Sequence, residues 1–349
     1  MHDACSADGT TDLHPELRQD PTTGEWAIIA PQRAQRPLHY ITPLAPPAPR
    51  PAFEPSCDFC PGQEARIPPP ISVTALPDIP QHWTVRVVPN KFPAVLSLRQ
   101  EHAAQPHPLF QTVAGVGHHE VVIDSPRHND GLATLAPAHL ALLVRIWRDR
   151  YRTLSTDSQV QQVMIFKNHG ARAGASMPHP HTQILATPTV ATAVQNRYTR
   201  ARHYLETQRQ CLFCALLQAE LAAGTRIVLE HTSYVAYQPY ASFFPYETWI
   251  VPRDHHACFG NASDIALTHL ACILHDVVRR LAQVLQEPDY NLVVRTALTE
   301  AHEPAYHWHL QLLPRLFSLA GFELGSGMAI NPVRPETAAA ALRNVARSA

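Results

Sequence analysis

Three polar side chains stand at alternate positions in one stretch of the sequence. His179, His181 and Gln183 occur in the run H-P-H-T-Q, which leads into the apolar pair Ile184 and Leu185. If the run from His181 onward is a β-strand, side chains two residues apart point to the same face of the sheet. Two imidazoles and an amide on one face can bind a metal ion, attack an electrophile or bind an anion. This stretch is therefore the first candidate for a functional site.

The same pattern recurs in the second half of the chain. His307, His309 and Gln311 again form H-x-H-x-Q before an apolar run, and residues 120–128 match residues 247–255 at nearly the same spacing. Several matches at one spacing indicate a duplicated unit. We therefore expect two similar halves, an N-terminal one over residues 13–195 and a C-terminal one over residues 196–349.

Charge and hydropathy exclude several classes of partner. The chain has 28 Lys and Arg against 29 Asp and Glu, so there is no overall attraction to nucleic acid or to anionic lipid. No stretch approaches the roughly 18 uncharged apolar residues that a membrane-spanning helix needs. The first residues lack a basic segment followed by an apolar one. We expect a cytoplasmic protein that binds neither nucleic acid nor membrane.

The pattern of apolar residues predicts an α+β fold. Strands are expected at 118–124, 161–167, 234–238, 247–251, 290–296 and 308–313, with long helices at 134–155 and 264–286. The glycine-rich segment 320–327 is expected to be a loop. Because strands arrive as hairpins interrupted by one helix in each half, the sheets should be mainly antiparallel with flanking helices.

Each half contains a C-x-x-C pair followed by two histidines. Two thiolates and two imidazoles form a tetrahedral zinc site and leave no position open for a substrate, so we expect two structural zinc ions per chain. The alternatives are free buried thiols beside hydrogen-bonded histidines, or a thioredoxin-like redox pair. The redox alternative is disfavoured because neither pair opens a helix in a βαβ setting. The expected ligands are Cys57, Cys60, His128 and His179 in the first half and Cys211, Cys214, His255 and His307 in the second.

If His179 binds metal, His181 is left for chemistry. A neutral imidazole near pH 7 is a competent nucleophile toward phosphorus, provided that its other ring nitrogen is held by a hydrogen bond. The amide of Gln183 can donate to a phosphate oxygen as negative charge builds up. The preceding loop, with Gly174 and Ser176, offers the small residues, backbone N–H groups and hydroxyl that a phosphate-binding loop requires, although the same residues also suit a plain turn.

Taken together, these motifs resemble a known family. The stretch 168–183, N-H-G-x-x-x-G-A-S-M-P-H-P-H-x-Q, is similar to the active-site signature of the galactose-1-phosphate uridylyltransferase family, a branch of the histidine triad superfamily. The similarity continues through D-P-x-T-G-E-W, P-N-K-F-P, S-P-x-H, H-W-H-L-Q and G-F-E-L-G-S-G, so it covers nearly the whole chain. The resemblance implies duplicated histidine-triad-like halves and a homodimer whose active sites are completed across the interface.

The resemblance also implies roles for individual residues. His181 would attack the α-phosphorus of a nucleotide sugar to give a nucleotidyl-histidine while a sugar 1-phosphate departs, and a second hexose 1-phosphate would then take the nucleotidyl group. Gln183 would steady the phosphoryl oxygens. The implied substrate-binding residues are Gly174 and Ser176 along the phosphate path, Asn90 and Asn168 at the nucleotide, Arg33 and Arg36 at the phosphates, and Phe322 and Glu323 near the hexose.

Three functions remain open from the sequence. The first is exchange between UDP-glucose and galactose 1-phosphate, and the second is an ADP-glucose phosphorylase in which inorganic phosphate takes the nucleotidyl group. The third, a zinc-stabilised RNA- or protein-binding module, is disfavoured by the neutral charge and the lack of interleaved aromatic and basic residues. His309 lacks the G-A-S-M-P approach and follows Trp308 instead of a proline, so we interpret it as a retained scaffold position.

Overall fold

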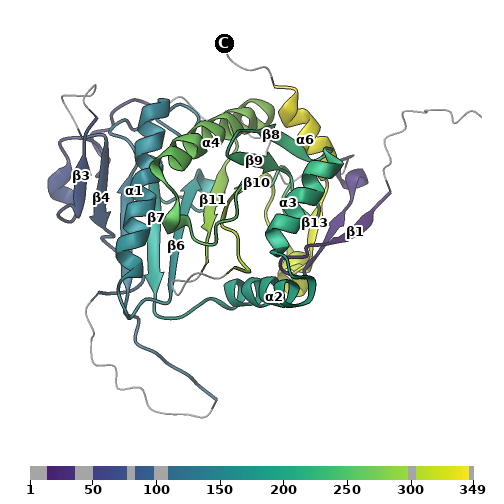
Figure 1. The fold of residues 1–349 in the computed structure, drawn as a ribbon. Coiled ribbons are helices and arrows are strands. Elements are labelled where there is room, and N and C mark those ends of the chain that lie inside the picture. Colours follow the sequence, from purple (N-terminus) through teal and green to yellow (C-terminus); the bar gives the residue numbers. More distant parts are fainter. Residues whose placement is uncertain (1–13, 36–49, 77–82, 98–108, 298–303, 346–349) are drawn as a thin grey trace, which may run out of the picture.

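A single large sheet runs through the molecule (Figure 1). The computed structural model describes residues 14–35, 50–76, 83–97, 109–297 and 304–345. Within these ranges, ten strands pair in the order β3-β4-β5-β7-β6-β11-β12-β10-β9-β8. Every neighbouring pair is antiparallel. The strands are β3 (Ser72–Thr74), β4 (Val85–Pro89), β5 (His118–Ile123), β6 (Gln162–His169), β7 (His181–Thr187), β8 (Ile227–Glu230), β9 (Tyr234–Tyr237), β10 (Thr248–Pro252), β11 (Tyr290–Arg295) and β12 (His309–Pro314).

The strand order shows the duplication directly. Read inward from one edge, the sheet runs β3-β4-β5-β7-β6, and read inward from the other it runs β8-β9-β10-β12-β11. The two series meet where β6 pairs with β11, with Phe166 opposite Val293. We call this junction the seam. The repeated order and the antiparallel pairing confirm the predicted fold class, while the boundary between residues 195 and 196 stays a prediction because the sheet is continuous.

Two helices cover one face of this sheet. Helices α1 (Pro137–Ser155) and α4 (Asp264–Leu285) pack together in front of the strands in Figure 1. Val122, Ile165 and Ile184 point to this face and belong to one buried cluster with residues of both helices. Since side chains alternate along a strand, their neighbours His181 and Gln183 point to the opposite face. The candidate catalytic residues therefore lie on the face that α1 and α4 leave uncovered.

A smaller sheet lies beyond the C-terminal half. Strands β1 (Glu16–Gln19) and β2 (Trp26–Ile29) are antiparallel, and β13 (Ala329–Asn331) pairs with β2 in parallel. Helices α2 (Thr192–Gln208), α3 (Leu212–Ala223), α5 (Gly321–Ser326) and α6 (Pro335–Arg343) complete the described elements. None of the helices in the described ranges is long and apolar enough to cross a bilayer.

The prediction of a loop at 320–327 is wrong, because this segment contains α5. The Glu323 carboxylate accepts the backbone N–H of Ala320 at 3.0 Å, which satisfies a free donor at the start of the helix. Gly327 follows the last turn with φ of 72°, in the left-handed conformation that commonly ends helices. A capping carboxylate and a terminal glycine thus make a short helix from a sequence whose glycines suggested a loop.

The contact between α1 and α4 gives a stability prediction. Leu270 of α4 is fully buried in the same cluster as Trp147 of α1. Leu270→Ala should lower the free energy of unfolding by about 2 to 5 kcal/mol, because it removes buried methyl groups and leaves a cavity. Ile265→Ala on the same helix, where the side chain is 72% exposed, is the control and should change it by less than about 0.5 kcal/mol. Urea denaturation followed by circular dichroism would measure both, and equal losses would contradict the packing described.

Candidate active site and metal centres

The four predicted ligands of the first metal site come together. The ligand atoms of Cys57, Cys60, His128 and His179 all lie within 4.8 Å of one another, and all four residues are buried. The Nδ1 atom of His179 is 3.6 Å from both sulfur atoms, and that of His128 is 3.6 Å from Cys60 Sγ. In a tetrahedral zinc site with ordinary bond lengths, sulfur and nitrogen ligands lie about 3.6 Å apart. The set therefore fits a zinc ion without rearrangement.

The protonation of this site also suits a cation. The Nε2–H of His179 donates to the backbone carbonyl of Ser125 at 2.8 Å, so the Nδ1 lone pair points toward the sulfur atoms. Burial raises the pKa of the Cys57 thiol to about 11 in the absence of a cation. A bound divalent ion reverses that effect, because it stabilises the thiolate directly. These residues would hold zinc as a structural ion, since all four positions are filled by protein.

The second set also converges, with one difference from the prediction. Cys214 Sγ lies 3.2 Å from His255 Nδ1 and 3.4 Å from His307 Nδ1, and Cys211 belongs to the same group of ligand atoms. Cys211 occupies the N-cap of α3, so this C-x-x-C does open a helix. That helix follows α2 instead of a strand, and two imidazoles face the thiols. The arrangement is therefore a second metal-type site and lacks the βαβ setting of a redox pair.

His181 begins β7 and is held in one orientation. Its Nδ1–H donates to the backbone carbonyl of His179 at 2.8 Å. This leaves the Nε2 lone pair for the pocket, and no described residue bonds that atom. Burial, together with the positive charge of Lys167, lowers the pKa of His181, so the ring is neutral at pH 7. A neutral imidazole with one nitrogen anchored and the other free is the arrangement required of a nucleophile.

A buried ion pair lies behind this histidine. Lys167 Nζ donates to Asp124 Oδ2 at 2.7 Å and to the backbone carbonyl of His181 at 3.0 Å. Both side chains are only 1% exposed. The pair fixes the first residue of β7 from the covered face of the sheet. Sequence reasoning missed it, because a lysine and an aspartate on different strands carry no signal that they will meet.

The pocket in front of His181 contains several predicted residues. It holds about 610 Å³ of space, part of it open to solvent, and is lined by His181, Gln183, Asn90 and Ser176. Lys91 lines the same pocket and was not predicted. Its ammonium group donates to the Arg66 carbonyl at 3.1 Å and lies 3.6 Å from Asp58 Oδ2, which lines the pocket as well. A nucleophile, amide donors, a hydroxyl and a cation in one pocket suit attack on a phosphorylated substrate.

Gln183 is oriented by a residue that the sequence analysis did not identify. The Nδ1 atom of His119 accepts the backbone N–H of Ala94 at 3.1 Å, so its Nε2 carries the proton and donates to Gln183 Oε1 at 2.9 Å. The amide NH₂ of Gln183 is thereby left for the pocket. Sequence reasoning carried no signal for this contact, because His119 and Gln183 lie on different strands, β5 and β7.

Two positions in the loop before β7 have backbone conformations that favour glycine. Gly174 has φ of 84° and ends a short 3-10 turn over Ala171–Ala173, and Gly170 has φ of 85°. A Cβ atom on Gly170 would lie 1.8 Å from Asp289 Oδ1. Asn168 accepts a hydrogen bond from Asn291 across the seam at 2.8 Å. Neither Asn168 nor Gly174 lines the pocket, so their proposed contacts with substrate stay predictions.

The remaining predicted substrate residues lie elsewhere in the same chain. Arg33 is in a 3-10 turn, Pro31–Gln35, directly after β2, and Phe322 and Glu323 are on α5 just before β13. None of the three lines the His181 pocket. Figure 1 shows β1 and β13 on the opposite flank of the molecule from β3 and β4. Arg36 lies outside the described residues. One chain thus presents two separate groups of predicted residues.

The second H-x-H-x-Q has a different environment from the first. His309 is fully buried and stacks on Trp249 with ring centres 4.4 Å apart. Its Nδ1–H donates to the His307 carbonyl at 3.2 Å, as in the first half, but no described residue bonds its Nε2 atom. A ring enclosed in this way cannot reach a substrate, which supports the interpretation of His309 as a scaffold residue.

Comparison with known proteins agrees over nearly the whole chain. Residues 7–191 match the family model for the N-terminal domain of galactose-1-phosphate uridyl transferase, and residues 196–348 match its C-terminal domain. The chain is 34% identical to ADP-glucose phosphorylase of Arabidopsis thaliana, over 97% of this chain and 95% of that protein. It is 29% identical to galactose-1-phosphate uridylyltransferase of Thermotoga maritima, over 94% of this chain and 98% of that protein.

Solved structures show the same relationship. The crystal structure of the Arabidopsis thaliana ADP-glucose phosphorylase with bound ADP-glucose superimposes with a TM-score of 0.81 at 31% identity, covering 96% of this chain and all of that one. A uridylyltransferase structure at 24% identity shares the fold, with a TM-score of 0.73 over 94% of this chain and 97% of that one. Fold and site therefore define a nucleotidyl-transferring enzyme. The chain belongs to the galactose-1-phosphate uridylyltransferase family.

The two metal sites predict a countable metal content. The purified protein should contain two zinc ions per chain by mass spectrometry, and Cys60→Ser and Cys214→Ser should each lose one, because a three-ligand remnant binds the ion far more weakly. Cys272→Ser is the matched control, since this thiol is exposed and belongs to neither set. Chelation should lower the melting temperature. Unchanged zinc in both Cys60 and Cys214 variants would show that these clusters are not metal sites.

Proposed function

We propose that this protein transfers a nucleotidyl group through a covalent intermediate on His181 Nε2. The observation that carries the proposal is the hydrogen bond from His181 Nδ1–H to the His179 carbonyl. It fixes the tautomer, aims the ring and leaves one lone pair facing a pocket with amide, hydroxyl and ammonium donors. This arrangement favours an enzyme over a binding module, because binding alone does not require an unprotonated nitrogen that faces a pocket.

The chemistry follows from these contacts. The Nε2 lone pair forms a bond to the α-phosphorus of a nucleotide sugar while the bond from that phosphorus to the bridging oxygen breaks, and the sugar 1-phosphate leaves with the electron pair. The Gln183 amide donates to the phosphoryl oxygens as charge shifts onto them. The positive charge left on the ring is stabilised through Nδ1–H and the His179 carbonyl. An acceptor phosphate oxygen then attacks the same phosphorus and releases His181.

For the substrates, we favour ADP-glucose with inorganic phosphate as the acceptor. The support is the 34% identity to the Arabidopsis thaliana ADP-glucose phosphorylase, against 29% to the Thermotoga maritima uridylyltransferase. The higher TM-score of the ADP-glucose-bound structure agrees with this choice. Exchange between UDP-glucose and galactose 1-phosphate, as in galactose metabolism, is the second candidate, because the matching family models carry that description.

We also propose a homodimer whose active sites are shared. Leu17, Trp26, Phe322 and Leu324, around the β1-β2-β13 sheet, are 44 to 73% exposed, and Phe92 at the rim of the His181 pocket is 82% exposed. Exposed apolar groups of this kind commonly mark interfaces. In such a dimer, the group of one chain that contains Arg33, Phe322 and Glu323 would lie over the His181 pocket of the partner. This contact would cover the exposed apolar residues of both regions and complete the substrate site.

Labelling tests the nucleophile and the base together. The wild-type protein incubated with ADP-glucose labelled at the α-phosphate should acquire acid-labile label, whereas His181→Asn should acquire none, because no lone pair reaches the phosphorus. His203→Asn, at an exposed histidine of α2, is the control and should label normally. Label on His181→Asn at the wild-type level would refute the nucleophile. Label from UDP-glucose alone would keep His181 but replace the phosphorylase with the uridylyltransferase.

Complementation tests the shared site. His181→Asn and Arg33→Met should each be inactive as homodimers. A heterodimer of the two, purified through different tags, contains one site with both residues intact. It should therefore recover about half of the wild-type activity, because a two-fold dimer has two equivalent sites. No recovery would mean that Arg33 and His181 serve the same site from one chain or that the dimer does not form; sedimentation of the wild type separates these outcomes.

A further inference from the structure

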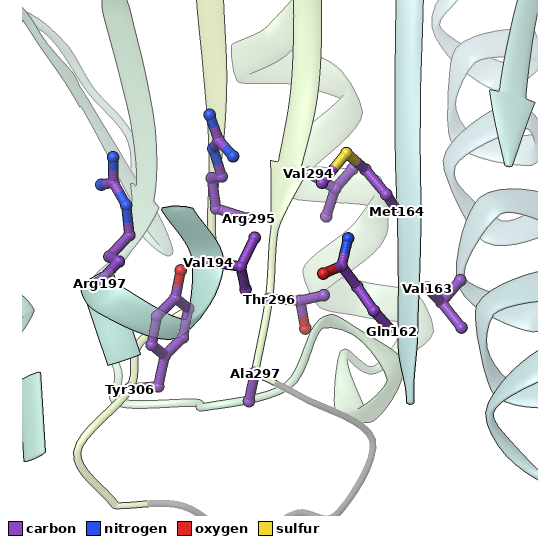
Figure 2. Close-up of a pocket in the computed structure, with 10 residues that line it drawn as sticks. All are labelled: Gln162, Val163, Met164, Val194, Arg197, Val294, Arg295, Thr296, Ala297 and Tyr306. Carbon is purple, nitrogen blue, oxygen red and sulfur yellow. The ribbon is translucent and has the colours of Figure 1, made fainter. Parts of the chain in front are cut away.

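A second pocket lies at the other end of the seam. Figure 2 shows it between α2, the start of β6 and the end of β11. It holds about 400 Å³ of space, part of it open to solvent. Gln162 at this end of β6 pairs with Thr187, the last residue of β7, whereas His181 is the first. The pocket is therefore separate from the one in front of His181. Its polar lining residues are Gln162, Arg197, Arg295, Thr296 and Tyr306, and none of the lining residues that the structure describes is acidic.

Among the described residues, a neutral side chain stands between each of the two arginines and the nearest carboxylate in its hydrogen-bond chain. Arg197 Nη1 donates to Thr22 Oγ1 at 2.7 Å, and that hydroxyl bonds Asp20 Oδ1 at 2.8 Å. In the described part of the chain, no carboxylate lies within ion-pair distance of Arg197. The guanidinium also lies over the ring of Trp249, 5.7 Å from its centre. Its charge is thus held in place without being neutralised by direct contact.

Arg295 is placed in the same way. Its Nε–H donates to Gln311 Oε1 at 2.8 Å, and the Gln311 amide donates to Glu247 Oε1 at 2.7 Å. Glu247 also accepts from Trp249 Nε1 and from the backbone N–H groups of Phe243 and Phe244, so its oxygens are already satisfied. Among the described residues, the terminal N–H groups of Arg295 have no partner. They are available to a ligand.

Neutral donors surround the two cations. Tyr306 is only 2% exposed, and within the described ranges its hydroxyl has no hydrogen-bond partner. Gln162 Oε1 accepts the backbone N–H of Ala191 at 2.9 Å, which leaves the amide NH₂ of Gln162 as a donor. In Figure 2 the Tyr306 hydroxyl and both guanidinium groups point the same way along the pocket. Such a set offers donors and positive charge but little to accept a hydrogen bond.

The acidic residues nearby lie beyond the arginines. Asp20, Glu25 and Glu247 line an adjoining cavity, whose wall also includes Arg197 and Arg295. Burial and the charge of Arg197 together lower the pKa of Arg295 to about 10. Two guanidinium groups held near each other away from water are destabilised by repulsion, and an anion bound between them would remove that cost.

We propose that this pocket binds an oxyanion, the phosphate group of a small phosphate monoester or inorganic phosphate, separately from the substrate of His181. Guanidinium groups recognise phosphate through paired N–H donors, and the tyrosine hydroxyl and glutamine amide add two more. Only a small part of the pocket admits a water-sized sphere, so the phosphate group would fill it and the organic part of a monoester would extend toward solvent. A bound anion would join α2, which follows the nucleophile strand β7, to the two strands of the seam. It should therefore stabilise the contact between the halves.

The test compares charge removal in the two pockets. Inorganic phosphate and glycerol 2-phosphate are titrated at constant ionic strength against chloride, by calorimetry and by thermal unfolding, into the wild type, Arg295→Met and Lys91→Met. Arg295→Met should weaken anion binding roughly tenfold or more, because it removes charge-assisted hydrogen bonds. Lys91→Met, in the His181 pocket, is the matched control and should leave this binding event unchanged. Tyr306→Phe, which removes one oxygen, should weaken it by a smaller factor and guards against misfolding of the arginine variant.

The outcomes separate this proposal from the proposed function. If the protein is a phosphorylase, inorganic phosphate also binds at His181, and Lys91→Met reports that event. Loss of binding in Lys91→Met with none in Arg295→Met or Tyr306→Phe would overturn the second site and leave the His181 proposal intact. Stabilisation no greater than that by chloride would also overturn it. Tighter binding of glycerol 2-phosphate than of phosphate would identify a monoester as the ligand, and the reverse order would identify the free ion.

Discussion

The site depends on one residue that serves two neighbours. His179 turns its Nδ1 atom toward two cysteines and donates its Nε2–H to the Ser125 carbonyl, while its own backbone carbonyl accepts the Nδ1–H of His181. A metal ion held by His179 would therefore fix the carbonyl that orients His181. The metal-type site would in this way support the residue that we propose as the nucleophile. The Lys167 and Asp124 pair completes the support from the covered face of the sheet.

The duplicated half shows what changes when the same frame is used differently. His307 and His309 repeat the ligand and the carbonyl-anchored imidazole, but Trp249 stacks on His309 where the first half has Val121 opposite Gln183. Gln311, the counterpart of Gln183, is taken up by Glu247 and Arg295. His309, the counterpart of the proposed nucleophile, is thereby enclosed, and Arg295 on β11 supplies positive charge to the anion site that we propose. The sheet thus carries the His181 pocket at one end of the seam and the arginine-lined pocket at the other.

Much of the frame could be predicted because it rests on local patterns. The alternation around His181, the apolar periodicity of 134–155 and 264–286, and the spacing of the cysteine and histidine sets fixed the strands, the main helices and the metal groups to within a few residues. The short helix α5 was missed because the glycines of 320–327 were given more weight than Glu323, whose carboxylate caps the first turn. His119, Lys167 and Asp124 were missed because their partners lie on other strands, and pairing between strands is a tertiary property. Arg33, Phe322 and Glu323 came from family resemblance, and one chain alone does not bring them to the pocket.

The central claim is that the His179 carbonyl decides which nitrogen of His181 reacts. The most direct measurement is to trap the labelled protein with its nucleotide sugar, digest it under alkaline conditions and identify by phosphorus and proton magnetic resonance the ring atom that carries phosphorus. With Nδ1 donating to the carbonyl, the nucleotidyl group must be on Nε2 of His181. A phosphorus–nitrogen bond at Nδ1, or on any other histidine, would contradict the account.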